Sequence, residues 1–125
     1  MDDQRKNLRC YYSHSMMIYD TPREQEELQT LNKLYKRVIC PNNDIGDCSK
    51  HMRAYGRIVS WADLVVVSEY ERHVGGGVYS EVHIALKAKI PVYCLRDGEF
   101  LPVVDAEVVD SRDFQVGFAK LIIQE

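Results

Sequence analysis

The sequence predicts an α/β fold of the flavodoxin/Rossmann type, a three-layer sandwich around a five-stranded, mainly parallel sheet. Short apolar segments alternate with amphipathic segments along the 125 residues. Residues 63–68 form an almost continuous apolar run, typical of a parallel strand that is covered on both faces. No repeat, linker or low-complexity stretch divides the chain. We therefore expect one domain spanning residues 1–125.

The first strand and first helix have the clearest signals. Residues 8–13 read as a strand, and a helix begins at Thr21-Pro22, with Thr21 at the N-cap and Glu24 three residues later. Apolar residues then repeat at helical spacing, at Leu28, Leu31, Leu34 and Tyr35. This segment is expected to cover one face of the sheet.

The middle of the chain continues the alternation. A second strand covers residues 37–40 and ends at Pro41, and residues 42–47 have the composition of a turn. A second helix is expected over 50–61, followed by the third strand at 63–68.

The last third is expected to complete the alternation. A third helix runs from about 78 to 88, a fourth strand covers 89–95, and residues 96–98 form a turn. A short fifth strand is expected at 107–109. A final helix, capped by Asp110 or Ser111, would carry the apolar residues Phe114, Phe118, Leu121 and Ile122.

Composition excludes several classes of protein. The net charge of −3 argues against a basic nucleic-acid-binding surface. No apolar run approaches the roughly 18 residues of a membrane span, and the N-terminus lacks a signal-peptide pattern, so we expect a cytoplasmic protein without a membrane partner. The four cysteines are scattered, and the Cys48-x-x-His51 pair has no second pair beside it. The sequence therefore predicts no metal site.

Three successive glycines mark the strongest candidate site. Gly75, Gly76 and Gly77 follow the third strand and open a helix, so backbone can approach a ligand and the N–H groups of the helix point at it. Glu81 follows in what we expect to be the first turn. It is either an acid stabilised by the helix dipole or a reacting group. The loop has neither the Walker A nor the G-x-G-x-x-G spacing, which argues against ATP hydrolysis and dinucleotide redox chemistry.

The residues around these glycines resemble the nucleoside 2-deoxyribosyltransferase superfamily, in particular its nucleotide N-glycosidase branch. The motif Gly77-Val78-Tyr79-Ser80-Glu81-Val82 is similar to that family's Gly-x-x-x-Glu-hydrophobic helix start. The Ala62-Asp63 step into an apolar strand and Tyr11 in the first strand match in the same order.

The resemblance implies a mechanism with three residues. Glu81 would attack C1′ of a (deoxy)nucleoside or its 5′-monophosphate, giving a glycosyl-enzyme intermediate that water or a second base resolves. Asp63 would orient or protonate the leaving base, or else only cap the start of its strand. Tyr11 would hydrogen-bond either Glu81 or the sugar and so hold the nucleophile in line. No cofactor is implied, and relatives that complete their sites across subunits imply a homodimer or larger homo-oligomer.

The loop after the first strand departs from that family's pattern. Ser13, His14 and Ser15 stand where relatives carry a Gly-Ser/Pro-Ile-Arg-like sequence, and Arg23 follows in the next helix. These residues, with Gly75–Gly77, are the candidate substrate-binding set. The apolar residues 16–19 suggest a lid over a base or a subunit contact.

Two other functions remain open from sequence. The same glycine loop could hold a nucleotide signal in a non-catalytic sensor. Similar glutamate chemistry could instead act on NAD, in a glycohydrolase.

Overall fold

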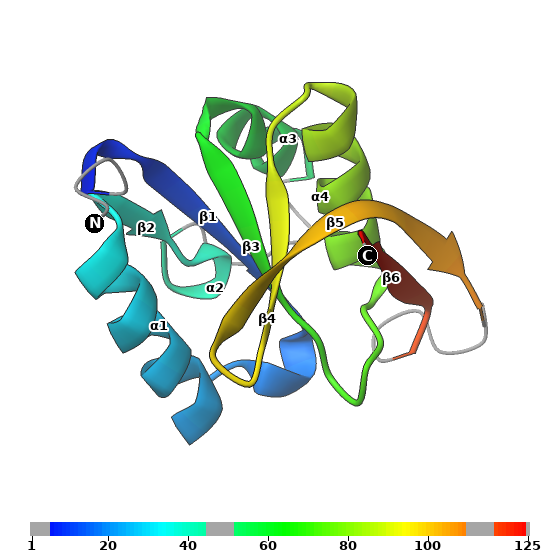
Figure 1. Cartoon of the computed structure of the whole chain (residues 1–125), viewed down its shortest axis with the longest axis horizontal. Coiled ribbons are helices and arrows are strands. Elements are labelled where there is room, and N and C mark those ends of the chain that lie inside the picture. Colours follow the sequence, from blue (N-terminus) through cyan, green and yellow to red (C-terminus); the bar gives the residue numbers. More distant parts are fainter. Residues whose placement is uncertain (1–5, 45–51, 110–116, 125) are drawn as a thin grey trace.

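The computed structural model of the protein describes residues 6–44, 52–109 and 117–124 (Figure 1). The first half contains β1 (Arg9–His14), the short 3-10 helix η2 (Met16–Ile18), α1 (Pro22–Leu34), β2 (Arg37–Ile39), α2 (Pro41–Asp44) and α3 (Met52–Trp61). The second half contains β3 (Leu64–Ser68), α4 (Gly76–Lys87), β4 (Val92–Arg96), β5 (Glu99–Val108) and β6 (Ala119–Ile123).

The sheet is mixed and has six strands in the order β2-β1-β3-β4-β5-β6. Strands β2, β1, β3 and β4 are parallel, whereas β5 and β6 are antiparallel to their neighbours. The predicted α/β class is confirmed. The prediction of five mainly parallel strands is wrong at the C-terminal side, where a hairpin and one further strand replace the last α/β unit.

The C-terminal segment was predicted as a helix, and its described part is strand β6. Phe118, Leu121 and Ile122 satisfy a helical spacing, but burial alternates along the strand, with Ala119 and Leu121 inward. A short apolar run fits both periods, so the pairing with β5 decided the outcome. The expected cap residues and Phe114 lie outside the described residues.

Strand β5 is ten residues long, although only 107–109 was expected to be a strand. Pro102 interrupts its apolar pattern, and the register shifts between Val103 and Asp105. Such an irregularity interrupts the alternation of apolar and polar residues by which a strand is recognised in a sequence. The Asp97-Gly98 turn joining β4 to β5 lies within the turn expected at 96–98.

Helix α1 begins as the sequence predicts, whereas the turn expected after the second strand, at 42–47, is wrong in part. Thr21 is the N-cap, and its hydroxyl accepts a hydrogen bond from Glu24 N at 3.3 Å. Pro22 occupies the first helical position, where a missing N–H costs nothing. Part of the expected turn 42–47 instead belongs to α2, and residues 45–47 lie outside the described residues.

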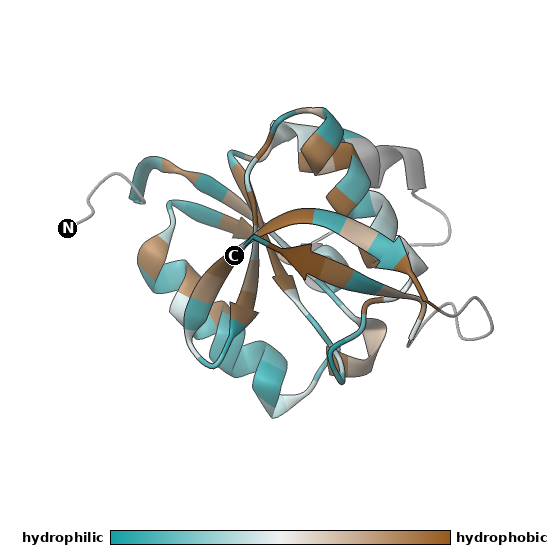
Figure 2. Cartoon of the chain, turned by 45° about the vertical axis from the view of Figure 1, so that its right-hand side comes forward, coloured by the Kyte–Doolittle hydropathy of each residue, from teal (hydrophilic) through white to brown (hydrophobic). Residues whose placement is uncertain are grey.

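Helices cover both faces of the sheet, and the apolar strands lie between them (Figures 1 and 2). One core joins α3 and α4 to one face, through residues such as Val59, Val82 and Val65. The other core joins α1 to the opposite face, through Leu31 and Val66. Side chains of a strand alternate between the two faces. Successive residues of β1 therefore enter different layers.

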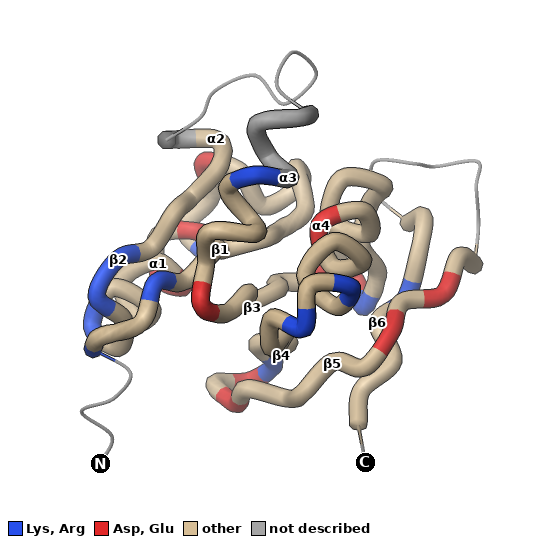
Figure 3. The backbone as a smooth tube through the Cα atoms, turned by 90° about the horizontal axis from the view of Figure 1, so that it is seen from above, with Lys and Arg blue, Asp and Glu red and all other residues tan. Residues whose placement is uncertain are grey.

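Charged groups are spread over the described part of the chain. Lys and Arg occur on several separate elements, with Asp and Glu between them (Figure 3). Within the described residues, no helix combines the length and the apolar character that crossing a membrane requires.

Candidate active site

The order of the strands creates a topological switch point at the ends of β1 and β3. The chain passes from β1 to β2 on one side and returns to β3 on the other side of β1. In sheets of this kind ligands bind beyond the carboxyl ends of the strands at such a switch point. Here those ends are paired His14 of β1 and Ser68 of β3.

Helix α4 presents its N-terminus and Glu81 to the sheet. Gly75 is the N-cap in extended conformation and has no side chain with which to cap the helix. The first N–H groups of a helix have no partner within it, so they remain available at this edge. Glu81 is the sixth helical residue, in the second turn, and the expectation that it lies in the first turn is wrong.

The Glu81 carboxylate is held between two hydroxyl groups of β1. Its Oε2 accepts a hydrogen bond from the Tyr11 hydroxyl at 2.5 Å, and its Oε1 accepts one from the Ser13 hydroxyl at 2.6 Å. Glu81 is only 9% exposed. A dipole-stabilised surface acid would be exposed in the first turn, so that interpretation does not fit the geometry.

Burial controls the ionisation of Glu81. Loss of water around the carboxylate raises its pKa to about 7, although the hydrogen bonds from Ser13 and Tyr11 act in the opposite direction. Both donors are neutral hydroxyls, which stabilise the anion less than a cation would. The carboxyl group is therefore poised to change its charge near neutral pH.

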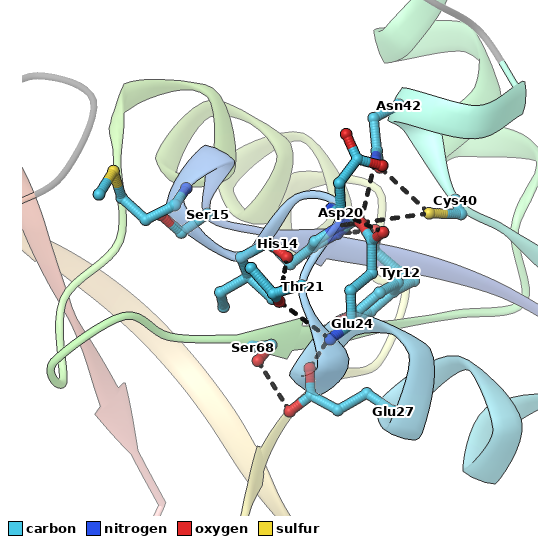
Figure 4. Close-up of polar contacts among 12 residues, drawn as sticks. Tyr12, His14, Ser15, Asp20, Thr21, Glu24, Glu27, Cys40, Asn42 and Ser68 are labelled. Atoms are coloured by element: carbon cyan, nitrogen blue, oxygen red, sulfur yellow. Dashed lines mark hydrogen bonds and ion pairs between the residues drawn. The ribbon is translucent and has the colours of Figure 1, made fainter.

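His14 lies on the opposite face of β1, in a second polar cluster (Figure 4). Its Nε2 is 2.7 Å from Oε2 of the buried Glu24. The same carboxylate accepts hydrogen bonds from the Asn42 amide at 2.9 Å and from Asp20 N at 3.1 Å. Burial acts to raise the pKa of Glu24, but these hydrogen bonds outweigh it and hold the pKa below its usual value.

Ser15 and Arg23 are engaged away from Glu81. The Ser15 hydroxyl accepts a hydrogen bond from Met17 N at 3.1 Å and so caps η2. The Arg23 guanidinium donates to the Ser68 hydroxyl at 2.8 Å and to the Glu69 carbonyl at 2.5 Å. The structure therefore separates Ser13, His14, Ser15 and Arg23, which were predicted to bind the substrate together.

Asp63 lies at the other end of the sheet from Glu81. It precedes β3 and binds Arg9, whose backbone N–H and Nε donate to Oδ2 at 2.8 and 3.1 Å. The Arg9 hydrogen bonds hold the pKa of Asp63 below its usual value. Arg9 is four residues before Ser13, about 13 Å along the strand. The structure does not bring Asp63 to Glu81.

The glycines leave room at the start of α4. Gly75 and Gly76 are buried, whereas Gly77 is exposed. A Cβ placed on Gly77 would meet no described atom within 4 Å. Gly77 is thus not required by crowding, and open space lies in front of it.

A cleft of about 490 Å³ lies beyond the ends of β3 and β4. Its walls include Arg23, Glu27, Glu69, Arg96 and Gly98, but not Glu81. Arg96 Nε is 2.7 Å from Glu69 Oε1, and Arg23 Nε is 3.4 Å from Glu27 Oε2. These wall residues pair with each other, so the cleft does not share the chemistry of Glu81.

The hydrogen bond between Ser13 and Glu81 was missed from sequence, since Ser13 was assigned to substrate binding. The signal that could have found it is the period of two in a strand. Tyr11 and Ser13 share one face, and Tyr12 and His14 share the other.

Comparison with models of known protein families, with curated proteins and with solved structures finds no match to this chain. The chemistry of the Glu81 site therefore carries the functional assignment.

Proposed function

We propose that the protein cleaves or transfers the N-glycosidic bond of a (deoxy)nucleoside or its 5′-monophosphate, with Glu81 as the nucleophile. One observation carries the proposal. A buried carboxylate is fixed by the Tyr11 and Ser13 hydroxyls at the carboxyl end of β1, beside the uncapped start of α4. The parallel strand order 2-1-3-4 is that of doubly wound, flavodoxin-like sheets, which bind nucleotides at this edge.

The proposed reaction has two steps. A Glu81 oxygen forms a bond to C1′ while the C1′–N bond breaks, and the base leaves with that electron pair and gains a proton. Water or a second base then attacks C1′ and releases the carboxylate. A carboxylate suits this reaction because C1′ becomes oxocarbenium-like in both transition states.

The two hydroxyl groups have a positioning role in this scheme. Each holds one oxygen of Glu81, so the carboxylate cannot rotate away from an attack direction. Because its pKa is about 7, the nucleophile is ionised only in part at neutral pH. Base release should therefore increase as the pH rises through 7.

The positions of the other candidate residues refine the proposal. Asp63 is bound to Arg9 at the far end of the sheet, so the proton for the leaving base comes from solvent or another group. Ser15 and Arg23 already have partners elsewhere. This arrangement favours nucleosides over 5′-monophosphates as substrates.

A non-catalytic nucleotide sensor is the second candidate. The open space at Gly77 and the uncapped N–H groups of α4 favour it, since they suit an anionic ligand whether or not a bond is cut. An enzyme acting on NAD would use the same carboxylate and release nicotinamide.

Exposed methionines follow the carboxyl end of β1, where they would cover a base bound at that edge of the sheet. Met16 and Met17 follow Ser15 and are 49% and 46% exposed, whereas Ile18 is buried. The same surface would serve contact with a second copy of the chain. Light scattering after size-exclusion chromatography, with and without nucleoside, distinguishes a monomer from the proposed homo-oligomer.

A chromatographic assay for free base tests the proposal. The chain would be incubated with deoxynucleosides, their monophosphates, ribonucleotides and NAD, beside Glu81→Gln and a surface control, Glu107→Gln on β5. Release that Glu81→Gln loses and the control keeps would support cleavage and identify the substrate class. Thermal stabilisation by a nucleotide without any release would instead support a sensor.

A further inference from the structure

A second cluster of reactive side chains, drawn in Figure 4, lies on the α1 side of the sheet. It joins His14 at the end of β1, Glu24 in the first turn of α1, and Cys40 directly after β2. All three side chains are buried, and their ligand atoms lie within 4.8 Å of one another. Burial of an imidazole, a carboxylate and a thiol at one point is costly unless these groups hydrogen-bond with each other or bind an ion.

His14 is oriented as a metal ligand would be. Its Nδ1 lies 3.1 Å from the Tyr12 carbonyl and can keep a proton there, while its Nε2 points at Glu24 Oε2. A metal ion that displaced the Nε2 proton would therefore meet a lone pair directed into the cluster. The ring also stacks on Tyr12, with centroids 3.9 Å apart and planes inclined by 7°. Histidines that bind metals commonly donate their second N–H to a backbone carbonyl in this way.

Glu24 and Cys40 complete the set of donors. Glu24 is only 3% exposed, and the Asn42 amide donates a hydrogen bond to its Oε2 at 2.9 Å. Its Oε1 accepts from Asp20 N, while its Oε2 faces both His14 and Cys40 Sγ, the latter at 3.9 Å. Asn42 Oδ1 lies 3.1 Å from Cys40 Sγ at the edge of the cluster.

We propose that His14, Glu24 and Cys40 bind one Zn²⁺ ion, with the fourth position beside Asn42. Tetrahedral zinc with bonds of about 2.0–2.3 Å separates its ligand atoms by roughly 3.3–3.7 Å. The contact between His14 and Glu24 would widen by about 0.6 Å, and the thiol would move inward. A thiolate and an imidazole favour zinc over magnesium or calcium, which prefer oxygen ligands.

The ion would act as a structural tie. It would join the ends of β1 and β2 to the start of α1, and a thiolate and a carboxylate together would balance its charge. His14 directly follows Ser13, which binds Glu81, so the ion would also fix the strand that positions the nucleophile. The proposal does not depend on the reaction at Glu81.

Metal binding by the full-length chain tests the site. The protein would be stripped with a chelator and titrated with Zn²⁺ against a chromophoric competitor, and then with Co²⁺ to record thiolate-to-metal charge-transfer absorption. Cys40→Ser removes one ligand. Cys94→Ser is the matched control, because Cys94 is also buried and lies 3.3 Å from a carboxylate oxygen of Glu69.

We expect one Zn²⁺ per chain, a cobalt charge-transfer band, and a higher midpoint of thermal unfolding with zinc. Cys40→Ser should weaken zinc binding by at least about 100-fold and abolish the band, whereas Cys94→Ser should retain both. His14→Gln should weaken binding similarly. If Cys40→Ser does not fold, the cobalt spectrum of the unaltered chain and the zinc affinity of His14→Gln decide. Absence of stoichiometric zinc binding, or binding unchanged in Cys40→Ser and His14→Gln, would overturn the proposal.

Discussion

Two buried glutamates contact opposite faces of β1, and their pKa values are shifted in opposite directions. On the α4 face, Tyr11 and Ser13 donate to Glu81, whose pKa is raised to about 7. On the α1 face, Glu24 is 3% exposed, yet its pKa is lowered. The difference lies in the partners. Glu24 is bound by a histidine, an amide and a backbone N–H, whereas the partners of Glu81 within the described part of the chain are two hydroxyls.

This comparison distinguishes a stabilising carboxylate from a reactive one. The hydrogen bonds to Glu24 outweigh the cost of burying its charge, so it contributes to the fold as an anion. Glu81 is under-compensated, so the folded protein bears a cost whenever it ionises. A group kept in such a state at a switch-point edge fits a role in chemistry better than a role in stability.

Replacing the proposed nucleophile should give the largest effect. Glu81→Gln preserves the shape and leaves both hydroxyls a partner, but an amide cannot form the glycosyl ester. We expect base release to fall by at least about 10³-fold. Initial rates of base release, with circular dichroism as the check on folding, measure it. Activity within a few-fold of the unaltered chain would remove Glu81 from the mechanism.

Replacing the other glutamate should damage the fold instead. Glu24→Gln leaves His14 without its anionic partner in a buried site, which should lower the free energy of unfolding by about 3 kcal/mol. Urea denaturation with a chelator present measures this loss from protein contacts alone. An unchanged midpoint would show that the cluster contributes nothing to stability.

The pH dependence of stability should have opposite signs for the two residues. The pKa of Glu81 in the folded protein is about 7, against an ordinary 4.5. The stability that its protonated carboxyl group contributes is therefore fully present below pH 4.5 and is lost as the pH rises through about 7. Glu81→Gln should therefore be more stable than the unaltered chain at pH 8, by about 2–3 kcal/mol, and equal to it near pH 4.

For Glu24 the folded pKa is depressed, so its stabilisation is present above 4.5 and is lost as the pH falls further. Urea denaturation at pH 4, 6 and 8 tests both signs. If the difference in free energy of unfolding between Glu81→Gln and the unaltered chain did not change with pH, the raised pKa would be contradicted.

Adjacent tyrosines provide a smaller and more specific test. Tyr11→Phe removes one donor to Glu81, so the acid limb of the pH–rate profile should move above 7 by up to about one pH unit. Tyr12→Phe is the matched control, because its hydroxyl binds Glu27 on the other face at 2.5 Å. Equal profiles for the two variants would show that Tyr11 does not control the ionisation of Glu81.

Asp63→Asn should have the smallest effect. Its partner Arg9 is partly exposed, at 38% for the side chain, so losing the pair should cost no more than about 1 kcal/mol. Base release should change by less than about three-fold, since Asp63 lies at the far end of the sheet. A large loss of activity with normal stability would return Asp63 to the mechanism.

The parallel half of the fold was predictable from sequence, and the antiparallel half was not. Strands such as Leu64–Ser68 are buried throughout and apolar up to their last residue, and they alternate with helices, which leaves little ambiguity. Strand β5 contains Pro102 and a register shift, and β6 is a short apolar run that also fits a helix. Whether such a segment becomes a strand depends on its pairing with a distant segment, and the hydrophobic pattern of the segment itself does not reveal that pairing.

The site shows the same division. The pairing of Tyr11 with Glu81 was anticipated from the resemblance, and the structure brings the two together. Ser13 and His14 were grouped in one loop because the strand was ended a residue early, at 13. Extending β1 to His14 sends these neighbours to opposite faces. The cluster of His14, Glu24 and Cys40 spans separations of 10 and 16 residues, which no metal-binding motif indicates.

Detection of the glycosyl-enzyme tests the central claim most directly. The chain would be mixed with the nucleoside that releases base, quenched with acid and digested, and the peptide containing Glu81 would be weighed by mass spectrometry. The account predicts an added deoxyribosyl or ribosyl group on that peptide, absent from Glu81→Gln. Base release with the peptide unmodified, at a rate that Glu81→Gln matches, would contradict it.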